Sequence, residues 1–253
     1  MAELALKVTA LTKQFGGLAA VNDVSLQVAR GTLHAVIGPN GAGKSTLIHL
    51  LSGDLSPTSG SVALNGSDIT HLAPDQRSRA GIGRSYQKTN IFPAFSVLEN
   101  CRLAAQSREP HAFNLFRSAA SYLSISQAAN EALDAVGLQH RARIKAGFLS
   151  HGEQRQLEIA MSLATKPQVL LLDEPLAGMG AQESTKMVTL LQKLIKNHAV
   201  LLVEHDMDAV FALADVLTVM VNGRVLESGT PEQIRNSAQV QRAYLGNEEA
   251  EHG

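Results

Sequence analysis

The sequence predicts an α/β fold in which short buried strands alternate with amphipathic helices. Continuous apolar runs of strand length, such as Val169–Leu172 and Ala199–Val203, indicate strands that are covered on both faces. Stretches with helical spacing of apolar residues lie between such runs, and one run leads directly into a glycine-rich turn. The composition, with 45 % hydrophobic and 18 % charged residues among 253, is that of a globular protein and argues against disorder, collagen-like repeats and coiled coils.

The first third of the chain predicts strands on either side of one helix. One strand shows alternation of apolar and polar residues, and the others are continuous apolar runs. In chain order, these elements are a half-buried strand with Val24, Leu26 and Val28 on one face, a strand over His34–Ile37, a helix over Lys44–Leu51 that ends at Gly53, a loop over 54–60, a strand over Ser61–Leu64, a turn at Asn65-Gly66 and a short strand-like segment over Ile82–Tyr86.

The middle of the chain differs from both ends because it contains no strand-like run. Apolar residues such as Leu98, Leu133 and Val136 recur there with helical spacing. The segment 107–126, which is rich in Ser, Ala and Phe and contains Pro110, shows no clear pattern. We therefore predict a helical subdomain, over about 96–150, that is inserted into the sheet domain.

After Ser150 the alternation of strands and helices returns. The predicted elements are a helix over Glu153–Ala164, a strand over Val169–Leu172, a helix over Glu183–Lys196, a strand over Ala199–Val203, a helix over Met207–Leu213, a hairpin of Val216–Val221 and Arg224–Leu226 around Asn222-Gly223, and a short helix that Thr230 caps and Pro231 begins. The polar residues 247–253 are expected to form a flexible tail.

The glycine-rich turn fits the phosphate-loop pattern G-x-x-x-x-G-K-[ST] between a predicted strand and a predicted helix. Glycines let backbone N–H groups curve around phosphate oxygens, and the helix directs its positive end at the same anion. Lys44 adds a charge near the β- and γ-phosphates, and the Ser45 hydroxyl suits Mg²⁺. The expected nucleotide-binding residues of this loop are Gly38, Pro39, Asn40, Gly41, Ala42, Gly43, Lys44, Ser45 and Thr46.

The apolar strand over 169–172 ends in two acidic residues, Asp173 and Glu174. Ligands gather at the carboxyl ends of parallel strands, so these side chains are candidates for chemistry. Asp173 is expected to hold Mg²⁺ opposite Ser45, and Glu174 to polarise the water that attacks the γ-phosphorus. Such a pair can also be an ordinary solvated turn, but the phosphate loop in the same chain favours the catalytic interpretation.

The order and spacing of four motifs resemble the ATP-binding cassette (ABC) family. These motifs are the phosphate loop, Leu149-Ser150-His151-Gly152-Glu153-Gln154, the strand that ends in Asp173-Glu174, and Val203-Glu204-His205-Asp206. The resemblance covers about residues 6–245. It implies a P-loop NTPase fold, with a RecA-like core, an N-terminal antiparallel β portion and the inserted helical subdomain, so that residues 4–246 form a single ABC ATPase domain. It also implies ATP and Mg²⁺ as the ligands.

The resemblance assigns a second phosphate-binding helix start at Ser150, Gly152 and Glu153. This segment is similar to the one otherwise written LSGGQ, whose helix faces the γ-phosphate of ATP held by another cassette. Ser150 and Gly152 before a helix also suit an anion on physical grounds. The family comparison therefore implies a second ABC subunit, in a homodimer or a heterodimer that closes around ATP.

Three more residues are assigned by resemblance alone. Gln87 is expected to contact Mg²⁺ or the attacking water, His205 to bond the γ-phosphate as the switch histidine, and Phe15 to stack on adenine. Each has an ordinary alternative, since a glutamine at a strand end is usually just exposed, a histidine at a helix start can cap it, and a phenylalanine can pack in a hairpin.

The sequence departs from the family pattern at two positions. His151 replaces a glycine and adds a Cβ atom where the backbone would approach phosphate, although Gly152 is kept. Gly180 stands where the loop after Glu174 normally ends in aspartate, so the usual carboxylate contact across the dimer is in doubt. We expect reduced tolerance at the first position without loss of function.

Local sequences resemble the subgroup that imports branched-chain amino acids. They are Phe15-Gly16-Gly17-Leu18, Glu174-Pro175-Leu176-Ala177-Gly178, Val203-Glu204-His205-Asp206-Met207 and the C-terminal stretch 229–246. This implies a subunit that dimerises on ATP, hydrolyses it and powers integral-membrane permease subunits, which receive cargo from a solute-binding protein. Importers of urea or short-chain amides and a lipopolysaccharide exporter share much of this sequence and remain alternatives.

The expected location is the cytoplasmic face of the inner or plasma membrane, reached through the permease. No apolar run has membrane-spanning length, and the N-terminus lacks the features of an export signal. A net charge of −1 gives no electrostatic footprint for nucleic acid. Ile91, Phe92 and Phe95 follow Gln87 and are expected either to meet a permease helix or to pack internally.

Other function classes fit less well. Cassette proteins of DNA repair or translation normally carry two cassettes or coiled-coil insertions, which this sequence lacks, and an Asn-Lys-x-Asp motif of GTPases is absent. A P-loop kinase would leave the motif after Leu149 unexplained. A module that binds ATP without turnover remains an alternative if Glu174 is misassigned.

Overall fold

The computed structural model describes residues 3–85, 90–108 and 123–248. Its centre is a six-stranded sheet in the order β10-β9-β3-β8-β7-β6. The strands are β3 (Leu33–Ile37), β6 (Ile82–Arg84), β7 (Val169–Asp173), β8 (Ala199–Val203), β9 (Val216–Val221) and β10 (Arg224–Gly229). All neighbours are parallel except β10, which pairs antiparallel with β9. The α/β prediction is therefore confirmed.

The central strands are buried on both faces, which explains their continuous apolar sequences. Along β7, Leu170 and Leu172 belong to one hydrophobic core, whereas Val169 and Leu171 belong to the other. The same alternation holds along β8 and β3. The sheet thus separates two cores and aligns the carboxyl ends of β3, β7 and β8 at one edge.

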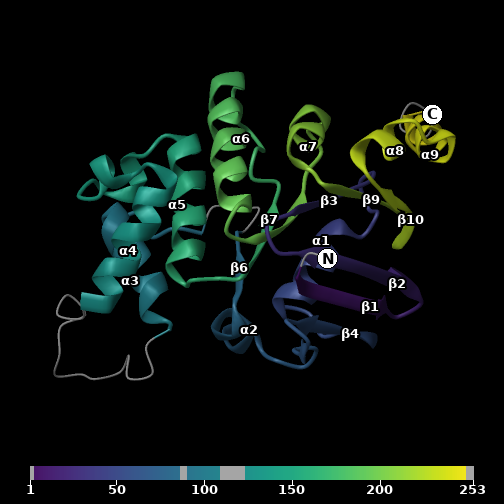
Figure 1. The fold of residues 1–253 in the computed structure, drawn as a ribbon, viewed down its shortest axis with the longest axis horizontal. Coiled ribbons are helices and arrows are strands. Elements are labelled where there is room, and N and C mark those ends of the chain that lie inside the picture. Colours follow the sequence, from purple (N-terminus) through teal and green to yellow (C-terminus); the bar gives the residue numbers. More distant parts are fainter. Residues whose placement is uncertain (1–2, 86–89, 109–122, 249–253) are drawn as a thin grey trace.

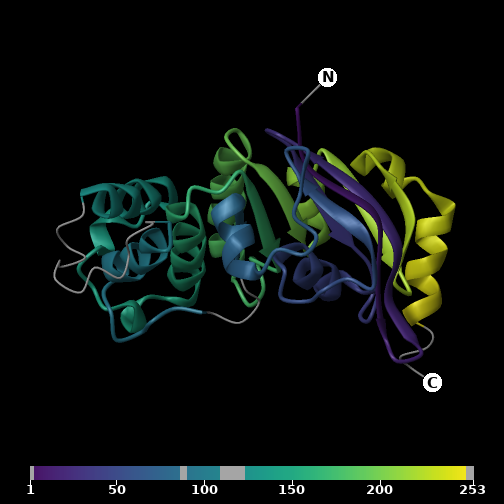
Figure 2. The same cartoon turned by 90° about the horizontal axis from the view of Figure 1, so that it is seen from below.

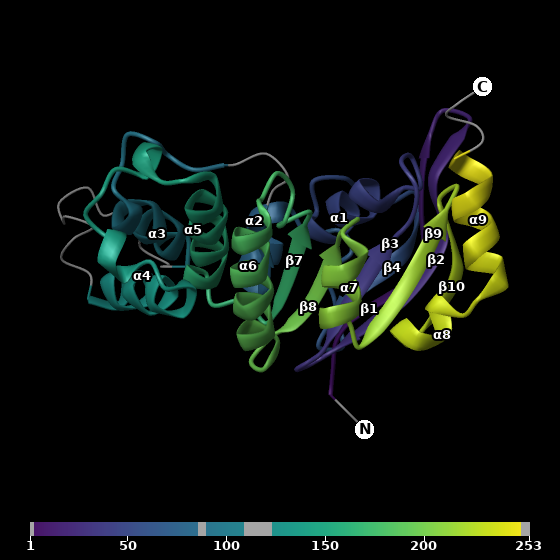
Figure 3. The same ribbon diagram turned by 90° about the horizontal axis from the view of Figure 1, so that it is seen from above.

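One face of the central sheet is covered by helices. α6 (Ala181–Ile195) and α7 (Met207–Leu213) lie across β7, β8 and β3, as Figure 3 shows. Their apolar residues, including Met187, Leu191 and Val210, join the core on that face. α8 (Pro231–Arg235) and α9 (Ala238–Glu248) follow β10 at the far end of the molecule (Figure 1).

The other face is covered by α1 (Lys44–Ser52) and by a second, antiparallel sheet. This sheet has the order β2-β1-β4-β5, with β1 (Leu4–Phe15), β2 (Leu18–Ala29), β4 (Ser59–Leu64) and β5 (Ser67–Asp68). Its long strands lie beside α9 at one end of the molecule (Figure 2). The short helix α2 (Pro74–Ala80) connects this sheet to β6.

Three helices pack together at the opposite end of the molecule (Figure 1). They are α3 (Val97–Gln106), α4 (Leu123–Val136) and α5 (His151–Ala164), with short 3₁₀ turns at Gln139–Arg141 and Ala146–Phe148. The hydroxyl of Ser162 on α5 donates to the backbone oxygen of Arg84 on β6 at 2.7 Å. This bond joins the helical region to the edge strand of the central sheet.

Several predicted elements match the structure closely, and the bounds of others shift by a few residues. β8 and α7 have the predicted bounds, and Asn222-Gly223 forms the expected hairpin turn with φ angles of 49° and 78°. α5 begins at His151 and not at Glu153, because Ser150 is its N-cap. α6 begins two residues early, and α9 continues through Glu248, past the predicted start of the tail. The unclear segment 107–126 falls mostly outside the described residues.

Candidate active site

The turn between β3 and α1 contains two positions that only glycine can occupy. Gly38 and Gly43 have φ angles of 153° and 99°. A Cβ atom at Gly38 would lie 2.1 Å from the backbone oxygen of Met220, and one at Gly43 would lie 2.3 Å from that of Ala20. Gly43 is the N-cap of α1 and makes no side-chain hydrogen bond to the helix. The N–H groups at this helix start are therefore free of a side-chain cap and suit an anion.

The side chain of Lys44 folds back over the same turn. Its Nζ atom donates to the backbone oxygens of Gly38 at 2.6 Å and Pro39 at 3.0 Å. Burial lowers the pKa of Lys44, and the negative charges of Glu174 and Asp173 oppose this shift. The ammonium group is thus held at the turn by acceptors that a phosphate group could replace.

Asp173, the last residue of β7, is only 2 % exposed. Its Oδ1 atom has no hydrogen-bond partner among the residues that the structure describes. Burial raises the pKa of Asp173, while the positive charge of Arg84 opposes this shift. A buried carboxylate oxygen without a partner is costly unless a cation meets it, and the Ser45 hydroxyl is exposed at the start of α1. These two oxygen donors fit a hard divalent cation.

Glu174 follows Asp173 with a left-handed backbone, at φ 47°. Its N–H donates to the backbone oxygen of Val203 at 2.9 Å, and its own carbonyl accepts from the N–H of Ala177 at 3.1 Å. Positive φ is unfavourable for a residue with a Cβ atom and is often found at functional sites. The side chain of Glu174 is partly exposed beside the buried Asp173.

His205 lies just after β8, with 66 % of its side chain exposed. Its backbone N–H donates to Oε2 of Glu204 at 3.0 Å. Glu204 itself is 1 % exposed, although the sequence predicts no role for it. The only signal was a charged residue directly after a fully apolar strand. Since β3, β8 and β7 are parallel neighbours, the structure brings the phosphate loop, Asp173, Glu174 and His205 to one edge of the sheet.

Ser150, Gly152 and Glu153 lie elsewhere, at the start of α5. Ser150 Oγ accepts from the N–H of Glu153 at 3.2 Å, and the Glu153 carboxylate accepts from the N–H of Ser150 at 2.9 Å. Arg141 Nε donates to the other oxygen of Glu153 at 2.8 Å. Burial raises the pKa of Glu153, but the bonds from Ser150 and Arg141 outweigh this and lower it. The carboxylate of Glu153 therefore takes part in the N-terminal cap of its own helix in this structure.

The start of α5 borders a pocket of about 230 Å³, lined by Ser150, Gly152, Met179 and Glu183, among others. None of the described residues that line it comes from the phosphate loop. A Cβ atom at Gly178 would lie 3.3 Å from the ring of His151, so this unexpected histidine packs against the loop after β7. The two predicted phosphate-binding helix starts are thus separate features of one chain.

Two predicted site residues stand apart from these groups. Phe15, at the end of β1, is 49 % exposed, and the Nζ atom of Lys13 lies 5.2 Å from the centre of its ring. An exposed ring is compatible with the predicted stacking on adenine, which stays a prediction. Gln87 lies outside the described residues, so its contact with Mg²⁺ or the attacking water stays a prediction.

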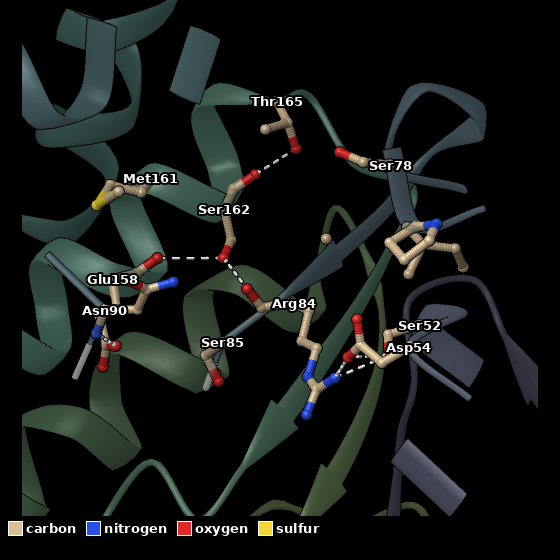
Figure 4. Close-up of a pocket in the computed structure, with 13 residues that line it drawn as sticks. Ser52, Asp54, Ser78, Arg84, Ser85, Asn90, Glu158, Met161, Ser162 and Thr165 are labelled. Carbon is tan, nitrogen blue, oxygen red and sulfur yellow. Dashed lines mark hydrogen bonds and ion pairs between the residues drawn. The ribbon is translucent and has the colours of Figure 1, made fainter. Parts of the chain in front are cut away.

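A second pocket, of about 200 Å³, lies between β6, α2 and α5 (Figure 4). Arg84 forms an ion pair with Asp54 on one side of it, and Glu158 on α5 accepts from the N–H of Asn90 at 2.6 Å on the other. Asn90 precedes the segment with Ile91, Phe92 and Phe95.

The aromatic residues of that segment face solvent. Phe92 and Phe95 are 51 % and 44 % exposed, and their rings stack with centroids 5.6 Å apart. Ile91, in contrast, packs against the core. Internal packing is thus observed for Ile91, and the permease contact stays a prediction for Phe92 and Phe95. Among the residues that the structure describes, no helix is both long and apolar enough to cross a bilayer.

The sequence matches known families over most of its length. The family described as "ABC transporter" matches residues 21–177, and the one described as "Branched-chain amino acid ATP-binding cassette transporter" matches residues 224–250. The chain is also similar to the "High-affinity branched-chain amino acid transport ATP-binding protein BraF" of Pseudomonas aeruginosa. Their identity is 41 % over 249 residues, which cover 95 % of this chain and 97 % of that protein.

Solved structures show the same architecture. The ADP conformation of MJ1267, an ATP-binding cassette of an ABC transporter, superimposes with a TM-score of 0.85 at 30 % identity, over 96 % of this chain and 99 % of that one. A dimeric, post-hydrolysis structure of the ATP-binding cassette MJ0796, bound to ADP and Pi, gives a TM-score of 0.76 at 26 % identity, over 89 % of this chain and 98 % of that one.

Proposed function

The chain belongs to the ABC transporter family, and on this premise we propose that it powers the uptake of branched-chain amino acids through a membrane permease. The matches confirm the predicted P-loop NTPase fold, the family and the class of ATPase. The cargo is inferred from the relative BraF and from the match of residues 224–250. The observation that carries the ATPase chemistry is the single sheet edge that holds Lys44, Asp173 and Glu174.

Each residue at this edge has a chemical role in the proposal. The glycine-lined turn and the start of α1 bind the triphosphate through backbone N–H groups, and Lys44 adds its charge. Glu174 accepts a hydrogen bond from the attacking water and orients it toward the γ-phosphorus. The exposed His205 contacts the γ-phosphate. This division of roles is supported by the partly exposed Glu174 beside a buried Asp173.

Mg²⁺ is the cation that the donor set fits. Asp173, whose Oδ1 has no hydrogen-bond partner within the described part of the chain, and the hydroxyl of Ser45 would hold it together with phosphate oxygens. Gln87 is a further candidate. Among the described residues, no group of three His, Cys, Asp or Glu side chains could hold a metal, so the nucleotide would supply the missing ligands. Bound there, the ion would neutralise charge that develops on the phosphates.

We infer that two cassettes close around ATP. ABC cassettes form dimers, as in the dimeric MJ0796, and this chain has two separate helix starts, those of α1 and α5, that the sequence predicts to bind phosphate. The start of α5, with Ser150 and Gly152, would meet the γ-phosphate held by the other subunit. Glu153, which the sequence placed in that contact, is paired with Arg141, and its role there stays a prediction.

The stacked Phe92 and Phe95 are the proposed contact to the permease. Both rings are exposed, and Asn90, two residues before Phe92, lines the pocket between β6, α2 and α5. The permease, which receives cargo from a solute-binding protein, would place this chain at the cytoplasmic face of the membrane. Phe92→Ser with Phe95→Ser should abolish co-purification of the permease from detergent extract and leave the basal ATPase rate of the isolated protein unchanged.

The test of the proposed function joins hydrolysis to uptake. In cells that lack this chain, wild-type protein should restore uptake of radiolabelled leucine, isoleucine and valine, whereas Glu174→Gln should restore none. The purified variant should bind ATP normally and hydrolyse it about 10²–10⁴ times more slowly, the usual loss when a general base is removed. Restored uptake of urea without leucine would refute the proposed cargo, and normal hydrolysis by Glu174→Gln would refute the proposed base.

A further inference from the structure

A glutamate directly follows each of the strands β7 and β8, at equivalent positions. The strands are parallel neighbours, and Asp173 is paired in register with Val203, so Glu174 and Glu204 each follow a paired residue. The two side chains differ in their surroundings. Glu174 is partly exposed, whereas Glu204 is 1 % exposed although it carries a carboxylate.

The two oxygens of Glu204 bind two different loops. Oε1 accepts the N–H of Leu176, in the turn after Glu174, at 2.8 Å. Oε2 accepts the N–H of His205 at 3.0 Å and that of Asp206 at 3.4 Å. Burial raises the pKa of Glu204, and the three backbone N–H bonds oppose this shift. The buried charge is thus compensated mainly by backbone groups of the loops that carry Glu174 and His205.

The turn after β7 needs such external support. Glu174 has a left-handed backbone at φ 47°, a conformation that a residue with a Cβ atom rarely adopts. Strained backbone persists only where the surrounding contacts hold it. The bond from the Glu174 N–H to Val203 fixes one side of the turn, and the bond from the Leu176 N–H to Glu204 fixes the other.

We propose that Glu204 is a positioning residue, which holds the turn of Glu174 and the loop of His205 in one arrangement for ATP hydrolysis. It acts through these two residues and does not itself touch the nucleotide. The inference rests on the roles proposed above for Glu174 and His205. Because a displacement of about 1 Å at a reacting group can reduce a rate about 100-fold, loss of either bond should impair turnover.

Glu204→Gln is the sharpest variant because it keeps the size of the side chain. An amide has one acceptor oxygen, and its NH₂ group cannot accept the remaining N–H bonds. We expect kcat to fall about 10- to 100-fold while the Kd for ATP changes less than about twofold, since the phosphate loop is untouched. Asp215→Asn is the matched control, since Asp215 accepts the N–H of Leu33 at 2.8 Å, at the other end of β3. Its kcat should be unchanged.

A double mutant separates positioning from a merely structural role. If Glu204 acts in part through Glu174, adding Glu204→Gln to Glu174→Gln should lower single-turnover hydrolysis by a smaller factor than Glu204→Gln does in the wild type. Multiplicative losses, or an unchanged kcat in Glu204→Gln, would overturn the proposal. If Glu174→Gln hydrolyses ATP normally, Glu174 is not the base. That result would refute the proposed function as well as the role of Glu204.

A measurement on the wild type covers the case in which Glu204→Gln does not fold. The amide protons of Leu176, His205 and Asp206 should exchange slowly with solvent in the intact protein, because each is bonded to a buried carboxylate. Fast exchange at Leu176 and His205 would refute the proposal without any substitution. Glu204→Asp, which keeps the charge but is too short to reach both loops, should show an intermediate kcat.

Discussion

The two helix starts that face phosphate in the proposed mechanism are built in opposite ways. The N-cap of α1 is Gly43, which provides no side-chain hydrogen bond, and Lys44 follows directly. The N-cap of α5 is Ser150, whose hydroxyl and N–H are both bonded to Glu153. The start of α1 has no side-chain cap and carries the positive charge of Lys44. The start of α5 is capped by its own residues and carries the carboxylate of Glu153, which forms an ion pair with Arg141.

This difference indicates which helix start supplies affinity. An uncapped helix start beside a lysine binds an anion by itself, so α1 can hold ATP within one subunit. The capped start of α5 is stable without a ligand and offers less to an anion, so it should add to a site that ATP already occupies. Nucleotide would thus bind first at α1, and α5 of the second subunit would follow. Four predictions test this comparison.

Lys44→Ala should have the largest effect on ATP binding, because it removes the positive charge at the uncapped start of α1. ATP at about 100 times its Kd stabilises a protein by about 2.7 kcal/mol, and the variant should lose this stabilisation together with all turnover. Thermal unfolding with and without ATP measures it. A melting shift like that of the wild type would mean that the triphosphate is bound elsewhere.

Ser150→Arg should separate the two helix starts. The large side chain would block the start of α5, so kcat should fall at least about 100-fold, as for other lost contacts to a transition-state charge. The Kd of the single subunit for ATP should stay within about twofold, since α1 is untouched. Equilibrium binding of a fluorescent ATP analogue is the measurement. A collapse of affinity would show that α5 acts on the ATP of its own subunit.

Asp173→Asn should raise the free energy of unfolding, because it removes a buried carboxylate beside the uncapped start of α1. Burial raises the pKa of Asp173, so between the ordinary value and the raised one the folded protein holds a proton that the unfolded chain has lost. The free energy of unfolding therefore falls as pH rises through this window. Without Mg²⁺ at pH 7, the variant should be more stable by about 1 kcal/mol, while losing turnover. A decrease in melting temperature would contradict this account.

Glu153→Gln should have the smallest effect. It weakens the cap of α5 and removes the ion pair with the partly exposed Arg141, which together should cost about 0.5–1 kcal/mol of stability. Chemical denaturation measures the change. Since the carboxylate belongs to the capped start, ATP affinity should not fall. A loss of ATP affinity would support the nucleotide contact that the sequence predicts for Glu153.

Local sequence signals predicted most of the elements. The hairpin at Asn222-Gly223, the C-cap at Gly53 and the cap of α8 at Thr230 all formed as expected, because short-range backbone preferences decide them. α2 is not among the elements that these signals predict, although Pro74 stands at its first position. The predicted start of α5 is two residues late, because Glu153 is part of a capping box with Ser150 and not the first helical residue.

Local sequence predicts the phosphate loop, the acidic strand end and the alternation of strands and helices, because these depend on neighbours within a few residues. The packing of distant segments decides that Asp173 has a buried oxygen without a partner among the described residues, that Glu153 is paired with Arg141, and that Glu204 bonds backbone groups of two loops. Burial and hydrogen-bond partners depend on which distant segments pack together. Glu204 bonds a backbone group 28 residues away, and no local pattern encodes such a contact.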